Sequence, residues 1–138
     1  MIMFRWKLFQ YQSSRGRLAI DDWRNNLPIG LPRADLDSFL KTMAKKEMWE
    51  YPDIRTLSGK KYRGLIELRW RSGNVPHRII GYSPGSHQFV MLIGCTHNKK
   101  KYYPPDCLDT AVRRKKKIES MEASICEFKL ITDQGNER

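Results

Sequence analysis

The sequence predicts an α+β domain in which helices pack on an antiparallel sheet of about four strands. Three observations support this prediction. Residues 64–71 and 75–82 alternate in polarity on either side of a Ser-Gly-Asn turn, as expected for a β-hairpin. Residues 87–96 are apolar on both faces, which favours a central position in the sheet. Residues 36–44 repeat apolar side chains at the spacing of a helix that buries one face.

The segment before the hairpin predicts one strand and two helices. Residues 3–12 alternate well enough to form a strand in the same sheet. Residues 18–26 form a short helix that ends before Pro28. The second helix begins at Pro32, because proline favours the first position of a helix.

The remaining segments predict a polar loop, a last helix and a tail. Residues 49–63 are polar and rich in turn residues, and Pro105 starts the last helix. The length fits one domain, which we place at residues 1–125. Residues 126–138 form a C-terminal tail that we expect to be partly disordered.

The hairpin places two arginines side by side. If Gly73 and Asn74 form its tip, Arg69 stands opposite Arg78 on one face of the sheet, while Leu68 points to the other face. Two guanidinium groups held together repel each other, so stability alone does not explain them. An anion bound between them would explain the pair.

The net charge is +11 for 138 residues, and the excess is concentrated in the middle of the chain. From Arg55 to Lys101 there are ten Lys or Arg residues, all three His residues and one acid, Glu67. A field of this sign concentrates polyanions, so we expect nucleic acid or an acidic protein as partner. A basic surface without a specific ligand is the alternative. No basic helix has a strongly apolar opposite face, so we expect no membrane binding.

The cysteines and the N-terminal segment indicate a cytoplasmic protein. Cys95, Cys107 and Cys126 are odd in number and lack CxxC spacing, so we expect free thiols in a reducing cytosol. Residues 1–12 lack the apolar run of a signal peptide, and no stretch is apolar enough to span a membrane.

A series of short motifs in a shared order resembles the RelE/HigB-type toxins, and within them the phage-derived, Gp-49-like branch. The resemblance covers most of the chain, roughly residues 3 to 115. The motifs are Leu57-Ser-Gly59, Gly64-Leu-Ile-Glu-Leu-Arg69, His77-Arg78-Ile79, Lys99, Pro104-Pro105 and Ala111.

The resemblance implies a RelE/ParE-like fold and the toxin of a type II toxin–antitoxin system. Such a toxin is an endoribonuclease (an mRNA interferase) that cleaves messenger RNA, often in the ribosome, and a cognate antitoxin neutralises it. One segment departs from the family. Where these toxins commonly have a Phe and two Lys after the last strand, this chain has Thr96, Asn98 and Lys99, with His97 close by.

The chemistry of RNA cleavage assigns roles to these residues. Attack by the 2′-hydroxyl needs a proton acceptor, a positive partner for the phosphate, and a donor for the leaving oxygen. Because Glu67 is the one carboxylate within the basic segment, we expect no metal ion and no cofactor. We assign phosphate stabilisation to Arg69 and Arg78. Lys60, Lys61 or Glu67 would assist the 2′-hydroxyl, and His97 or Lys99 would donate the proton. The residues expected to contact RNA are Lys60, Lys61, Arg63, Arg71, Lys100, Lys101 and Tyr102.

Three alternatives remain open at this point. Arg78 and Glu67 could form a salt bridge that only holds the hairpin together. The same fold could act as a protein-binding poison, as in the ParE branch that inhibits gyrase. The chain could also be a catalytically inactive module that binds nucleic acid or the antitoxin. In each toxin hypothesis, an acidic antitoxin segment would cover the basic groove.

Overall fold

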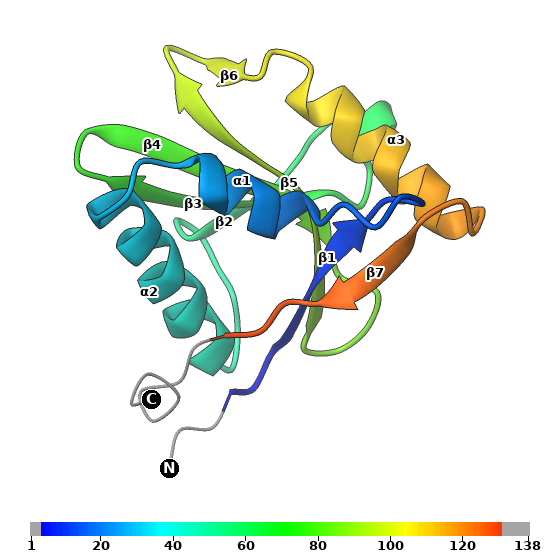
Figure 1. The fold of residues 1–138 in the computed structure, drawn as a ribbon, viewed down its shortest axis with the longest axis horizontal. Coiled ribbons are helices and arrows are strands. Elements are labelled where there is room, and N and C mark those ends of the chain that lie inside the picture. Colours follow the sequence, from blue (N-terminus) through cyan, green and yellow to red (C-terminus); the bar gives the residue numbers. More distant parts are fainter. Residues whose placement is uncertain (1–3, 131–138) are drawn as a thin grey trace.

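The computed structural model describes residues 4–130, which form three helices and a seven-stranded sheet (Figure 1). The N-terminal elements are β1 (Lys7–Gln12), α1 (Ala19–Asn26), α2 (Leu31–Lys45), β2 (Ile54–Thr56) and the 3-10 helix η1 (Lys60–Tyr62). The elements that follow are β3 (Ile66–Ser72), β4 (Val75–Tyr82), β5 (Gln88–Asn98), β6 (Lys101–Tyr103), α3 (Cys107–Glu119) and β7 (Ser124–Glu127).

The strand order is β2-β3-β4-β5-β1-β7, and β6 pairs with β5 outside this path. The predicted antiparallel meander of β3, β4 and β5 is confirmed, and β5 is central as expected. The expectation of an antiparallel, RelE/ParE-like sheet of about four strands is wrong, because the sheet has seven strands and β1 runs parallel to β5.

Two physical reasons explain this difference. The strands that periodicity missed, β2, β6 and β7, have only three or four residues each, too few for alternation to be recognised. The long connection between β1 and β5 allows the chain to return in the same direction, which a tight hairpin does not.

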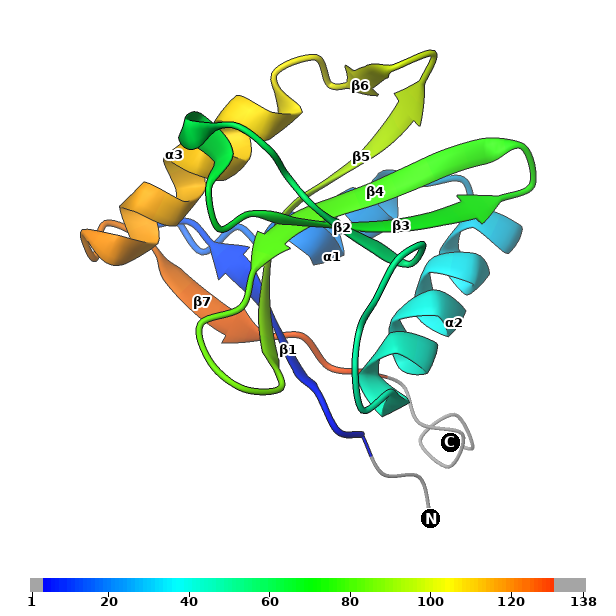
Figure 2. The ribbon, with the colours of Figure 1, turned by 180° about the vertical axis from the view of Figure 1, so that it is seen from behind.

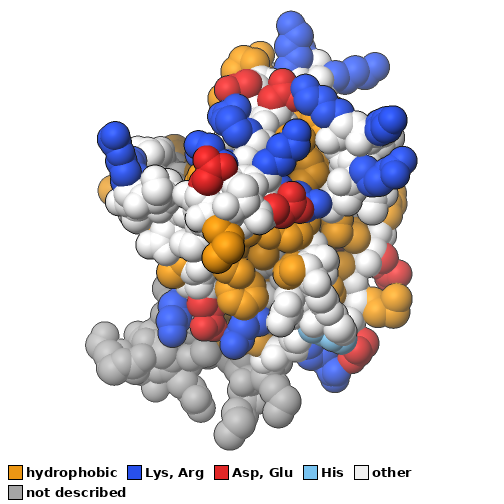
Figure 3. All heavy atoms as spheres, turned by 90° about the vertical axis from the view of Figure 1, so that its right-hand side faces the viewer, with side chains coloured by type: hydrophobic (Ala, Val, Ile, Leu, Met, Phe, Trp, Pro, Cys, Tyr) orange, Lys and Arg blue, Asp and Glu red, His pale blue; other side chains and the backbone are white. Residues whose placement is uncertain are grey.

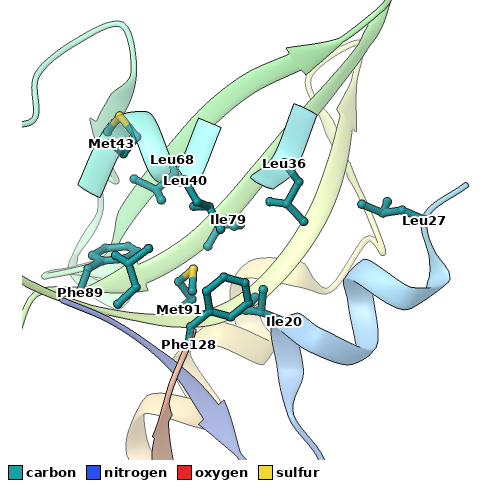
Figure 4. Packing of buried hydrophobic residues seen from close by; sticks show 11 residues of the cluster. Ile20, Leu27, Leu36, Leu40, Met43, Leu68, Ile79, Phe89, Met91 and Phe128 are labelled. Atoms are coloured by element: carbon teal, nitrogen blue, oxygen red, sulfur yellow. The ribbon is translucent and has the colours of Figure 1, made fainter. Parts of the chain in front are cut away.

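Helices α1 and α2 cover one face of the sheet. Figure 4 shows Leu36, Leu40 and Met43 of α2 near Leu68 and Ile79 of the hairpin, and all five side chains are fully buried. This confirms the predicted helical stripe. The other face packs against α3 through a second apolar cluster.

Helix α1 approaches the sheet so closely that one strand position must be glycine. A Cβ atom on Gly94 of β5 would lie 2.2 Å from the ring of Trp23. Two carbon atoms cannot approach this closely, so the indole ring occupies the volume that any other side chain would need.

The C-terminal segment belongs to the sheet. Strand β7 pairs antiparallel with β1, and the buried Phe128 donates its backbone N–H to the carbonyl of Leu8 at 2.8 Å. The expected boundary after residue 125 therefore falls inside β7. The rest of the expected tail, from residue 131, lies outside the described residues, as do residues 1–3. None of the three helices within residues 4–130 combines the length and the apolar character that a bilayer span requires.

Candidate functional site

The predicted pair of arginines lies on the α3 side of the hairpin. Arg69 of β3 is the register partner of Arg78 of β4, as the turn position predicted. Glu67 lies two residues before Arg69, so strand alternation places it on the same face. The side chains of Arg69 and Arg78 are 26% and 10% exposed, and that of Glu67 is 2% exposed.

Strand β2 adds a third arginine that the sequence analysis did not assign to the site. Arg55 is the register partner of Glu67. The nearest nitrogen–oxygen distances to the Glu67 carboxylate are 3.7 Å for Arg55, 3.5 Å for Arg69 and 3.8 Å for Arg78. One carboxylate cannot neutralise three guanidinium groups, so this group of four side chains, the arginine cluster, carries an excess of two positive charges.

Tyr102 of β6 reaches into the arginine cluster. Its hydroxyl donates a hydrogen bond to Glu67 Oε2 at 2.5 Å. Two strands separate β6 from β3 in the sheet, which would place them about 14 Å apart if the sheet were flat. The end of the sheet therefore curls over the cluster; Figure 2 shows the end of β5 and β6 rising away from the β3–β4 hairpin.

Tyr102 is a hydrogen-bond donor in this position. Burial, and then the bond to Glu67, raise the pKa of its hydroxyl far above the usual range. The phenol stays protonated at neutral pH and holds the Glu67 carboxylate in place.

His97 lies beside Tyr102, its register partner across the β5–β6 pair. The imidazole packs edge-on against the Tyr102 ring, with centroids 4.8 Å apart. Burial, and then the charge of Arg78, lower the pKa of His97. A neutral imidazole accepts protons, so this environment favours a base role over the donor role that the sequence analysis assigned to His97.

The two central arginines differ in how their donors are used. Arg78 donates to its neighbour's carbonyl, that of His77, at 2.8 Å. Arg69 has a buried Nε atom with no hydrogen-bond partner among residues 4–130, and its guanidinium lies 5.8 Å from the ring centre of Tyr51. This Nε atom faces Glu67 Oε1 at 3.5 Å and is itself buried, so an anion would be bound by the other nitrogens of the Arg69 guanidinium.

The structure does not gather the predicted lysines into one site. Lys61 Nζ lies 2.7 Å from Asp109 Oδ1, and this contact raises the pKa of Lys61. Lys60 is exposed in η1.

Lys99 and Lys100 form the tip of the β5–β6 hairpin. Both have positive φ angles, 48° and 69°, which match a tight two-residue hairpin turn. Lys99 directly follows the last residue of β5, two residues beyond His97, and is exposed. The other residues predicted to contact RNA are also exposed: Arg63, Arg71, Lys100 and Lys101.

The basic surface continues onto α3. Figure 3 shows Lys and Arg side chains gathered over the upper part of the face on which α3 lies. Arg113, Lys116 and Lys117 are exposed on this helix. Arg114 has a structural role, because it donates to the carbonyl of Leu92 at 2.8 Å.

Two contributions were missed in the sequence analysis, Arg55 and the bond from Tyr102 to Glu67. The available signal for Arg55 was the pair of β-branched residues around it, Ile54 and Thr56, which favour a strand but form too short a run to be recognised. No local pattern could show that β6 folds back over β3.

Within residues 4–130, no group of three or more His, Cys, Asp or Glu side chains is arranged to hold a metal ion. Comparison of the chain with models of known protein families, with curated proteins and with solved structures finds no match.

Proposed function

We propose that this protein is a toxin that cleaves messenger RNA without a metal ion, as the endoribonuclease of a toxin–antitoxin system. The observation that carries the proposal is the arginine cluster, in which three guanidinium groups surround one buried carboxylate. The proposed partners are messenger RNA on the ribosome and an antitoxin with an acidic segment that covers the cluster.

The charge of the cluster fits the reaction. When a 2′-oxygen attacks the adjacent phosphate, the five-coordinate phosphorus group carries two negative charges in its fully ionised form. The cluster has an excess of two positive charges in a partly buried place, where electrostatic stabilisation is stronger than in water. Arg69 and Arg78 would bind the non-bridging oxygens, and the Arg69 guanidinium, whose side chain is partly exposed, would do so through its terminal nitrogens.

The neighbouring side chains supply the proton transfers. His97 would accept the proton of the 2′-hydroxyl, because its lowered pKa keeps it neutral. The Lys99 ammonium would give a proton to the leaving 5′-oxygen. The products would be a 2′,3′-cyclic phosphate and a 5′-hydroxyl. Tyr102 acts as a positioning residue, since it holds the carboxylate that spaces the arginines.

One observation favours a second function, a module that binds RNA or protein without catalysis. All three arginines lie within 4 Å of Glu67, as an arrangement that only holds the hairpin would require. Against this, the three contacts are long, and Arg69 Nε makes no hydrogen bond to any described residue. The arginines therefore retain N–H groups that can donate hydrogen bonds to a ligand.

The test is to measure cleavage of messenger RNA, with and without ribosomes, by the wild type, Arg69→Ala and Arg69→Lys. We expect Arg69→Ala to lose about 2–4 kcal/mol of transition-state stabilisation, which is about 30- to 1,000-fold in rate. Arg69→Lys should recover little, because an ammonium cannot reproduce the two-pronged guanidinium contact.

The matched control is Arg15→Ala, which removes an exposed arginine from outside the residues assigned to the site. It should keep nearly full activity, and both variants should melt near the wild-type temperature. A wild-type protein that binds RNA without cleaving it, on or off the ribosome, would favour the inactive module. Cleavage that survives Arg69→Ala would place the active site elsewhere.

A further inference from the structure

Two buried cysteines touch each other beside the arginine cluster. Cys95 lies in β5 and Cys107 is the first residue of α3, and neither has exposed surface. Their Sγ atoms are 2.9 Å apart, and both residues are free thiols. A disulfide bond is about 2.05 Å long, so the two sulfurs need to approach by less than 1 Å to form one.

We propose that Cys95 and Cys107 are a redox-active pair that forms a reversible disulfide between β5 and α3. This inference does not depend on the proposed ribonuclease function. The two sulfurs come from different elements and point at each other, which simple packing of cysteine as a small apolar residue does not require.

The oxidant we name is hydrogen peroxide, which is small enough to reach a buried pair during local opening. Cys107 reacts first as the thiolate in this scheme, because the contact with Cys107, and then burial, keep the Cys95 thiol protonated by raising its pKa. The thiolate attacks one peroxide oxygen, the O–O bond breaks, and the departing hydroxide takes up a proton as water. The resulting sulfenic acid on Cys107 is then attacked by Cys95.

The second step forms the disulfide and releases the second water. The Cys95 sulfur forms the S–S bond, the S–O bond breaks, and a second water leaves with the Cys95 proton. Two thiols are oxidised by two electrons and one peroxide is reduced to two waters. The contact with Cys107, and then burial, raise the pKa of Cys95, which fits its role as the second, resolving thiol.

The disulfide would act on the candidate site through the chain between the cysteines. That segment contains all the residues that pair between β5 and β6, including His97 and Tyr102. Cys95 is also the register partner of Arg78. Oxidation would therefore close a covalent ring around the hairpin and fix it over the arginine cluster.

The experiment is to treat the reduced full chain with hydrogen peroxide, block the remaining thiols, and digest the protein for mass spectrometry. We expect the peptides that hold Cys95 and Cys107 to be joined with the loss of two hydrogen atoms, and dithiothreitol to separate them. Amide hydrogen exchange at residues 97–103 should slow by about tenfold in the oxidised protein.

The third cysteine provides the control. Cys126 lies in β7 and is partly exposed, so Cys126→Ser should leave the Cys95–Cys107 link unchanged. Cys95→Ala and Cys107→Ala should each abolish the link and the change in exchange. If the wild type keeps both buried thiols free while Cys126 is oxidised, the proposal is wrong. Because these readouts do not involve RNA, they stand whether or not the protein cleaves it.

Discussion

The two faces of the β3–β4 hairpin come from alternate residues of the same strands, yet one face is apolar and the other is charged. On the face toward α2, Leu68 and Ile79 are fully buried, and Trp70 stacks on Phe39 with ring centres 4.8 Å apart. On the face toward α3, Glu67 is buried among arginines at distances of 3.5 to 3.8 Å.

The difference indicates where stability and function lie in this molecule. Apolar burial stabilises the fold by about 25 cal/mol for each Å² removed from water. A buried charge loses hydration energy that its ion pairs often fail to restore, and apolar residues in its place are often as stable. The α2 face therefore holds the domain together. The charged face is better explained by a ligand than by stability.

The largest expected effect comes from the apolar face. Leu40 of α2 is fully buried in the core, so Leu40→Ala should lower the free energy of unfolding by about 2–5 kcal/mol. Chemical denaturation measures this change. The control is Thr42→Ala on the exposed side of the same helix, which should change stability by about 0.5 kcal/mol or less. Equal stability of the two variants would contradict the assignment of this face as the core.

A smaller loss is expected from the charged face. Glu67→Gln keeps the shape of the side chain but leaves three arginines without their carboxylate, and should cost about 1–3 kcal/mol. Phosphate or sulfate should restore part of this stability by occupying the cluster. The control is Glu47→Gln, which removes an exposed ion pair with Arg5 and should cost about 1 kcal/mol or less. A Glu67→Gln protein as stable as the wild type, with no response to anions, would contradict the charge argument.

The smallest effect is a pH dependence that distinguishes the two faces through their histidines. Burial, and then Arg78, lower the pKa of both His77 on the α2 face and His97 on the charged face. Below about pH 6.5 the unfolded chain binds protons that the folded chain does not, so these residues make stability fall as the pH decreases. Above that pH their contribution is constant.

The effect of salt on the pKa should distinguish the two histidines. The pKa of His97 is also raised by Glu67 and lowered by Arg55 and Arg69. The arginine side chains are 55% and 26% exposed and Glu67 is buried, so salt should screen the arginines more and raise that pKa. His77 lies in contact with the rings of Trp23 and Trp70, and its pKa should change less. NMR titration of the two imidazoles at low and high salt measures both values. If salt shifted the two pKa values equally, the charges on the two faces would be equally well screened, which contradicts this comparison.

The sequence predicted what depends on local periodicity. Alternation along β3, together with the turn at Gly73, was enough to set Arg69 opposite Arg78, because a register error would turn every side chain to the wrong face. The apolar stripe around Leu40 was predicted equally well, because the side chains on that face of α2 are buried in the same core and are therefore apolar at helical spacing.

The parts that the sequence did not predict depend on contacts between distant segments. Strands β2, β6 and β7 exist because a neighbouring strand offers hydrogen bonds, and their own residues are too few to show a period. For the same reason the contribution of Arg55 to the site was missed. The bond from Tyr102 to Glu67 depends on the curl of the sheet, which no local pattern encodes.

The position of β1 in the strand order determines when a newly made chain can finish folding. Leu8 pairs with Phe89 of β5, and Gln10 pairs with Cys126 of β7. Strand β1 must therefore wait until β5 and β7, which come much later in the sequence, have been made. Pairing between such distant segments is slow, because the entropy of the intervening loop is lost before the contacts form. Until then, β1 remains unpaired, with the side chains that it will bury still open to aggregation, so unfinished chains are natural substrates for chaperones and proteases.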